Sequence, residues 1–177
     1  MTDTHRLAVA PLRTAMRLLV EGFGSHATEV AAVADNLIDA NLAGHDSHGI
    51  GMLPRYVDAY LEGGLKPNQH VTTVLDAGAM LRLDGNAGFG QVIGFEAMAL
   101  GIERARQSGC AIVALGNAHH LGRIGAWAEQ AAAAGLVSMH FVNVVARPIV
   151  APHGGAHAGF GTNPFTAGVP LPGRPPL

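Results

Sequence analysis

The spacing of apolar residues changes near residue 70, and this change limits the folds that the chain can adopt. Before that point, apolar residues recur every three to four positions, the period of a helix with one buried face. Beyond it, short apolar runs such as VTTVL and CAIVAL alternate with helical patterns. The sequence therefore predicts a helical first part and a second part of mixed α/β structure.

The first part is expected to contain three helices. Pro11 suits a first helical turn and Gly24 a helix end. Ser25 is predicted to cap a second helix, which ends at Gly44. A third helix is expected from about Leu53 to Gly63 and Gly64, where apolar residues again recur at helical spacing.

The second part is expected to combine a hairpin, helices and buried strands. VTTVL and MLRLD predict the hairpin, and CAIVAL predicts a strand. The apolar run LVSMHFVNVV, residues 136–145, is predicted to be a buried strand. A helix is expected between the hairpin and the CAIVAL strand. Its core face is predicted to carry Phe95, Met98, Ala99 and Ile102.

Composition excludes several kinds of partner. Of the 177 residues, 49% are hydrophobic, which is enough to bury a core. Only 14% are charged, and this low fraction indicates a surface partly covered by another subunit or by missing chain. A net charge of −2 without a Lys/Arg run argues against nucleic acid and anionic membranes. MTDTHRLAVAPLR lacks the apolar centre of a signal peptide, and no apolar run has the roughly 18 residues of a membrane helix. The single cysteine, Cys110, cannot form a disulfide within the chain. Together these features predict a cytoplasmic protein.

The segment GNAHHLGRIGAW, residues 116–127, places His119 and His120 between a predicted strand and a predicted helix. The carboxyl ends of strands in α/β sheets are where ligands commonly bind. A histidine pair in such a turn can bind a metal, transfer a proton, contact a cofactor or serve only the structure of the turn.

A second glycine-rich segment, DGNAGFGQVIG at 84–94, follows a strand and opens a helix. Its glycines read G-x-G-x-x-x-G instead of the dinucleotide pattern G-x-G-x-x-G, and no acidic residue stands where a ribose ligand is expected. The favoured interpretation is that these glycines serve turns and close packing.

Metal and serine-nucleophile chemistry have weaker support. His45 and His48 are three apart, but no H-E-x-x-H motif or paired Cys/His set completes a ligand group, so no metal is predicted. Ser47 lacks the G-x-S-x-G turn of a nucleophilic serine.

A dinucleotide phosphate fits the histidine segment better. Gly122 and Gly125 permit close backbone approach at a predicted helix start, and Arg123 adds positive charge. A histidine with a pKa of about 6.5 just upstream can exchange a proton with a substrate hydroxyl.

Three segments in collinear order resemble the type 2 malate/L-lactate dehydrogenase family: AGHDSHGIGMLPRYV, GNAHHLGRIGAWAEQAAAAG, and APHGG followed by GTNPF. The resemblance implies an enzyme that interconverts 2-hydroxycarboxylates and 2-oxocarboxylates with NAD or NADP. It implies a non-Rossmann fold like that of L-sulfolactate dehydrogenase, with a helical domain over 1–70 and a cofactor domain over 71–177. It also implies a cytoplasmic homodimer whose partners are small acids.

The resemblance assigns roles to single residues. It implies that His120 is the catalytic acid or base and that His119 is secondary. Cofactor contacts are implied for His48, Gly122, Arg123 and Ile124, and substrate contacts for Ser47 and Tyr56.

The sequence departs from the family in two ways. Met52 occupies a position where many relatives carry an arginine for the substrate carboxylate, so Arg55, or a residue outside this chain, is expected to replace it. The chain also stops at PLPGRPPL, where relatives continue, and is expected to be a truncated form. Two alternatives stay open: a non-catalytic remnant that folds by association with another chain, and a hydrolase that uses a histidine-bound metal.

Overall fold

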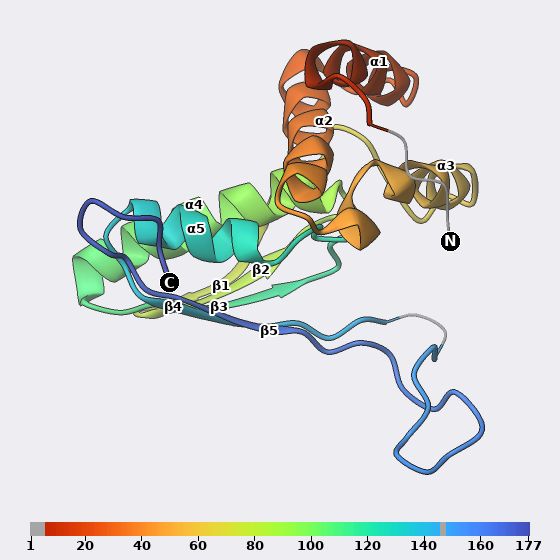
Figure 1. Cartoon of the computed structure of the whole chain (residues 1–177). Helices are drawn as coiled ribbons and strands as arrows, with labels where there is room; N and C mark the ends of the chain where they lie inside the picture. The colour runs from red at the N-terminus through yellow and green to blue at the C-terminus, as the bar shows by residue number, and fades with distance from the viewer. Residues whose placement is uncertain (1–5, 146–147) are drawn as a thin grey trace. The chain divides into compact units, whose positions relative to one another are not determined.

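The structure, a computed structural model, describes residues 6–145 and 148–177 of the chain (Figure 1). Residues 1–5, which belong to the N-terminal segment predicted not to be a signal peptide, lie outside the described residues. The chain divides into two compact units, Met1–Arg123 and Ile124–Leu177. The domain boundary near residue 70 stays a prediction, and the two units are described separately below.

The first unit begins with three helices, as expected from the apolar spacing. They are α1 (Val9–Glu21), α2 (Ala27–Leu42) and α3 (Leu53–Leu61), with 3-10 turns at Asp46–His48 and Ile50–Met52. Their apolar faces meet in one core, whose fully buried members include Val20, Val33, Leu37, Ile38 and Tyr56.

The predicted capping role of Ser25 is wrong. His26 occupies the N-cap of α2 and makes no side-chain capping bond. Ser25 lies one residue earlier, where its Oγ donates a hydrogen bond of 2.6 Å to Oε1 of Glu29. Glu29 is buried, and its carboxylate also accepts from the backbone N–H of Asn68. Ser25 therefore helps to satisfy a buried charge instead of a helix end.

The helices precede a three-stranded sheet in the same unit. β1 (Thr72–Ala77) and β2 (Met80–Asp84) form the predicted antiparallel hairpin, and β3 (Ile112–Gly116) pairs parallel with β2. The crossover is α4 (Gly90–Ser108), which lies along the sheet (Figure 1). Its Ala97 packs against Leu81 and Leu83 of β2. The fold is mixed α/β, as predicted.

The predicted core face of α4 is wrong. Phe95 is 57% exposed, whereas the buried positions are Gly90, Gln91, Ile93, Gly94, Ala97 and Gly101. Small residues on that face allow α4 to approach the sheet closely: a Cβ added to Gly101 would lie 2.9 Å from Val113 Cγ2. Close approach, not side-chain bulk, decided which face is buried.

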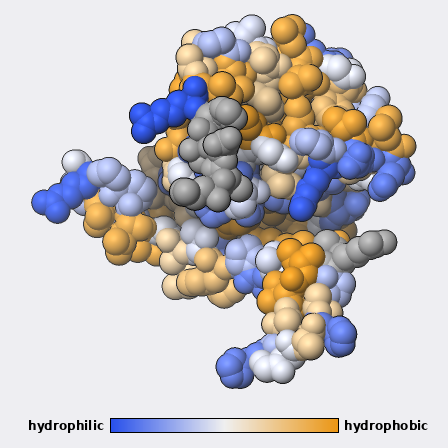
Figure 2. All heavy atoms as spheres, turned by 45° about the vertical axis from the view of Figure 1, so that its right-hand side comes forward, coloured by the Kyte–Doolittle hydropathy of each residue, from blue (hydrophilic) through white to orange (hydrophobic). Residues whose placement is uncertain are grey.

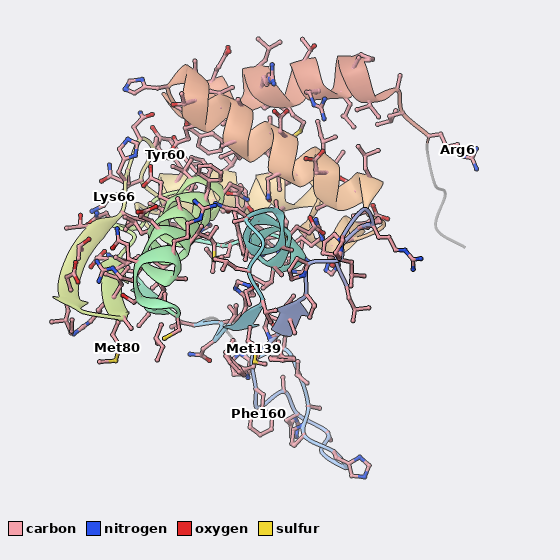
Figure 3. The ribbon with its side chains drawn as sticks, turned by 90° about the vertical axis from the view of Figure 1, so that its left-hand side faces the viewer. Arg6, Tyr60, Lys66, Met80, Met139 and Phe160 are labelled. Atoms are coloured by element: carbon pink, nitrogen blue, oxygen red, sulfur yellow. The ribbon has the colours of Figure 1, made fainter. Side chains whose placement is uncertain are left out.

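The second unit contains α5 (Gly125–Ala133) and an antiparallel pair, β4 (Ser138–Phe141) and β5 (Phe165–Gly168). The prediction of a buried strand over 136–145 is wrong in extent and in burial. Only four of those residues form a strand, and Met139, labelled in Figure 3, and Phe141 are 66% and 79% exposed. β4 pairs with β5 alone among the described residues, and α5 packs against the pair.

Apolar side chains also reach the surface of the first unit, among them Leu18, Leu19, Leu42 and Leu61. Figure 2 shows apolar residues (orange) in several places on the face that it presents. These exposures agree with the low charge content of the chain. In the part of the chain that the structure describes, no helix is both long and apolar enough to cross a membrane.

The glycines of the segment 84–94 serve close packing, which confirms the prediction for this segment. A Cβ added to Gly90 would lie 2.1 Å from the carbonyl oxygen of His120, and one added to Gly85 would lie 3.0 Å from Cα of Ala118. The N–H of His119 also donates to the carbonyl of Gly88, at 3.1 Å. The start of α4 is therefore pressed against the backbone of the histidine turn.

Gly90→Ala should destabilise the protein by about 3 kcal/mol, because the new methyl group meets a backbone carbonyl that cannot move without displacing the turn. Gly116→Ala is the matched control, since a Cβ there meets nothing within 4 Å. Chemical denaturation followed by circular dichroism gives both values. Equal stability of the two variants would contradict this packing.

Candidate active site

The site is built where α3 meets the loop after β3. Tyr56, in α3, is fully buried, and its hydroxyl forms a hydrogen bond of 2.8 Å with Nδ1 of His120. Gln91, in the first turn of α4, donates from Nε2 to the same hydroxyl at 2.8 Å. One phenol thus connects the helical layer, the loop after β3 and the start of α4.

His48 lies beside His120 although 72 positions separate them in the sequence. The two imidazole rings stack, with centroids 5.1 Å apart and planes at 29°. Ser47 Oγ is 2.9 Å from Nδ1 of His48, so the predicted substrate and cofactor residues of the Asp46–His48 turn are neighbours.

Asn41 shapes the backbone that carries His48. Its Oδ1 accepts a hydrogen bond of 2.9 Å from the N–H of Ile50, and its Nδ2 donates to Asp46. A Cβ at Gly49 would fall 2.1 Å from Asn41 Oδ1, so the turn closes this tightly only with glycine after His48. The glycine of S-H-G is explained by this packing.

The histidines of the site are neutral at pH 7. Burial, followed by the neighbouring charges of His48, His119 and Arg55, lowers the pKa of His120 from 6.5 to about 4. Burial also lowers the pKa of His48 and that of His119. Burial raises the pKa of Tyr56 to about 12, so its hydroxyl keeps its proton. His120 is thus an unprotonated base held by a neutral phenol.

Arg55, in α3, carries a positive charge that lowers the pKa of His120. Its side chain is exposed, and among the described residues no carboxylate lies within 4.0 Å of its guanidinium. Met52 is only 9% exposed and belongs to the helical core. An arginine at position 52 would have to leave that core, whereas Arg55 already reaches solvent beside the site.

The predicted cofactor residues after His120 have a packing role as well. Gly122 has φ +69°, and a Cβ there would lie 2.6 Å from Oδ1 of Asn36 in α2. Arg123 is half-buried, and Ile124, at 9% exposure, is the first residue of the second unit. A side chain at position 122 would disturb α2, so its substitution cannot isolate a cofactor contact.

Sequence reasoning missed Gln91. A single glutamine carries no motif, and the helix that contains it was predicted with the wrong buried face. With the correct face, a polar residue at a buried position, 2% exposed, would have indicated a hydrogen-bonding role. Within the described residues, no group of three or more His, Cys, Asp or Glu side chains is arranged to hold a metal ion.

A neutral histidine held by a tyrosine, with a second histidine stacked on it, can act as a general acid or base toward a group placed at its other ring nitrogen. Here that arrangement lies in a mixed α/β fold. The chain belongs to the malate/L-lactate dehydrogenase family, whose sequence model matches residues 7–177.

Known proteins similar to this chain have several substrates in their names. The chain is 54% identical to hydroxycarboxylate dehydrogenase B of Escherichia coli K12, over 100% of this chain and 49% of that protein. Its structure resembles malate dehydrogenase from Pyrococcus horikoshii OT3 with a TM-score of 0.87 at 33% identity, covering 97% and 49% of the two chains. It also resembles sulfolactate dehydrogenase from Methanocaldococcus jannaschii with a TM-score of 0.84 at 32% identity, covering 92% and 47%. The chain spans about half the length of the curated relatives it matches.

Stability should depend on pH through His120. Its pKa is about 4 in the folded state and 6.5 as the ordinary value, so between these values the unfolded state binds more protons. The free energy of unfolding should therefore fall, by on the order of 2 kcal/mol, as the pH is lowered across this window.

Urea denaturation of the protein and of His120→Leu at pH 7, 6, 5 and 4 measures this effect. The variant, which lacks the titrating group, should lose less stability over the same interval. An identical pH dependence in both proteins would show that His120 does not carry the shifted pKa.

Proposed function

We propose that this chain supplies the proton-transfer site of an NAD(P)-dependent dehydrogenase that interconverts 2-hydroxycarboxylates and 2-oxocarboxylates. The observation that carries the proposal is the neutral His120, bound through Nδ1 to Tyr56 and stacked on His48, in a chain of the malate/L-lactate dehydrogenase family. In this proposal the substrate lies on the Nε2 side of His120.

His120 exchanges the proton of the substrate hydroxyl. Because Nδ1 is held by Tyr56, Nε2 is the ring nitrogen left for the substrate. With a pKa of about 4, the imidazole is unprotonated at pH 7 and takes the proton of a 2-hydroxyl group during oxidation. In the reverse direction it returns that proton to the oxygen of the 2-oxo group.

The substrate carboxylate is proposed to bind Arg55. Its guanidinium is exposed, has no carboxylate partner among the described residues, and is close enough to lower the pKa of His120. A planar guanidinium binds a carboxylate through two parallel hydrogen bonds, which orients the 2-position of the acid. Ser47, next to His48, is proposed to donate or accept a hydrogen bond at the substrate.

The residues proposed to hold the cofactor are His48, Gly122, Arg123 and Ile124. Their chemistry fits a dinucleotide: an imidazole beside the reacting histidine, a guanidinium for phosphate, and a backbone turn with a glycine. When bound, NAD or NADP supplies the acceptor or donor of the substrate hydride. The wider proposal keeps the helical domain over 1–70, the cofactor domain over 71–177, a homodimer and a cytoplasmic location.

A second candidate is a non-catalytic chain that folds by association. The exposed apolar residues of β4, Met139 and Phe141, favour it, because such a surface is usually covered. Assembly state measured by light scattering, together with nicotinamide binding, separates the two: association without binding favours the second candidate.

His120→Ala should lower turnover by about 10² to 10⁴, the range for loss of a general acid or base. The test uses a chimera in which these 177 residues precede the part of E. coli hydroxycarboxylate dehydrogenase B that lies beyond the matched half. Turnover of pyruvate, oxaloacetate and related 2-oxo acids is followed by nicotinamide absorbance. His26→Ala, at an exposed histidine, is the control. Turnover close to that of the control would exclude His120 as the proton donor.

Arg55→Gln in the same chimera should raise KM for the 2-oxo acid about 10-fold or more, because a charged hydrogen-bonding partner is lost. Arg82→Gln is the matched control, since Arg82 is an exposed arginine of β2. Steady-state kinetics decides the matter. If KM is unchanged in both variants, another residue binds the carboxylate.

A further inference from the structure

Gln91 is buried at the site without a complete set of hydrogen bonds. Its side chain is 2% exposed, and Nε2 donates to Tyr56 Oη at 2.8 Å. Its other amide atom, Oε1, is buried and has no partner among the described residues. A buried carbonyl oxygen left unpaired is costly, so its retention calls for a physical explanation.

The hydrogen bond between Tyr56 and His120 can run in either direction. When Nδ1 of His120 is unprotonated, the phenol donates to it. When Nδ1 carries hydrogen, it donates to the phenol oxygen, and the phenol hydrogen needs another acceptor. The described hydrogen-bond partners of Tyr56 Oη are His120 and Gln91, so Gln91 is the group that can supply this acceptor.

We propose that Gln91 is a positioning residue that sets which nitrogen of His120 carries the proton. With its amide N–H toward Tyr56, the phenol donates to Nδ1, and the neutral imidazole carries its hydrogen on Nε2. With its Oε1 toward Tyr56, the phenol donates to Gln91 and accepts from Nδ1–H. Exchange of the two arrangements combines rotation of the amide by half a turn with the uptake of one proton at one nitrogen of His120 and the release of one proton from the other, both through solvent. The inference rests on the proposed function for its chemical use.

The two arrangements serve different steps of the proposed reaction. In the first, Nε2–H faces the substrate and donates a hydrogen bond that orients the oxygen of a 2-oxo acid, whereas the proton that this oxygen receives in reduction comes from the imidazolium of the second arrangement. In the second, the lone pair of Nε2 receives the hydroxyl proton of a 2-hydroxy acid, and the resulting imidazolium keeps its Nδ1–H on Tyr56. A glutamine, with both a donor and an acceptor, supports both arrangements, whereas a carboxylate or an apolar side chain does not.

The other groups that face His120 oppose its protonation. His48 from the Asp46–His48 turn, His119 from the same loop and Arg55 from α3 all lower its pKa. Tyr56 and Gln91 are the neutral groups behind Nδ1. On the Nδ1 side of His120, it is therefore the acceptor Oε1 of Gln91, acting through Tyr56, that stabilises the imidazolium.

The experiment is 15N NMR of the imidazole of His120 in the 177-residue protein as a function of pH. In the neutral form, the unmodified protein should show hydrogen on Nε2. Gln91→Glu, whose carboxylate only accepts, should move the hydrogen to Nδ1 and raise the pKa of His120 by about one unit or more. Gln91→Met, of similar length but without a polar atom, should keep hydrogen on Nε2 and lower the pKa.

Tyr56→Phe separates a relay through the phenol from a direct effect of charge. In the Tyr56→Phe background, Gln91→Glu should lose most of its effect on the tautomer and pKa of His120. An unmodified protein with Nδ1–H, or a Gln91→Glu effect of the same size without the phenol, would overturn the proposal.

A second readout applies if a variant folds too poorly for NMR. Diethyl pyrocarbonate reacts with neutral imidazole, and mass spectrometry of the peptide that contains His120 gives its pKa from the pH dependence of the rate. Neither measurement needs a cofactor or turnover. An inactive chimera with the expected NMR result would reject the proposed function alone, and an active one with unchanged tautomers would reject the relay alone.

Discussion

The close packing of Gly90 against the carbonyl of His120 is the constraint on which the site depends. Because no side chain intervenes, α4 begins directly against the histidine turn. The next residue, Gln91, then reaches the hydroxyl of Tyr56, and that hydroxyl reaches Nδ1 of His120. One missing methyl group thus allows three separate elements to share a hydrogen-bond chain, and burial of that chain keeps His120 neutral.

The elements of the first unit could be predicted from the sequence to a large extent. Apolar spacing and glycine positions were enough for α1–α3 and for the β1–β2 hairpin, because these are local patterns. The buried face of α4 was not predictable in this way. Small residues there let the helix approach the sheet, and the larger Phe95 lies outside at 57% exposure. The apolar composition of LVSMHFVNVV predicts a buried strand, but burial depends on neighbours that a single segment does not specify.

The site was predicted in part. The resemblance named Tyr56, His48 and His120, and in the structure both Tyr56 and His48 contact His120, which is more than 60 positions later in the sequence. Their roles stay proposals. Gln91 and Asn41 have no motif and act only through the groups they touch, so no pattern in one sequence indicates them. Arg55 is exposed and stands three residues after the buried Met52, and the proposed function assigns the substrate carboxylate to it.

The central claim is that a 2-oxo acid binds against Nε2 of His120. Protection of His120 from diethyl pyrocarbonate in the chimera, with NADH and the unreactive analogue oxamate, tests it most directly, because the readout is one residue and needs no turnover. The account predicts that oxamate slows modification of His120 by about 10-fold or more, while the exposed His26 reacts at an unchanged rate. Equal rates at His120 with and without oxamate, at concentrations that inhibit the chimera, would contradict the account.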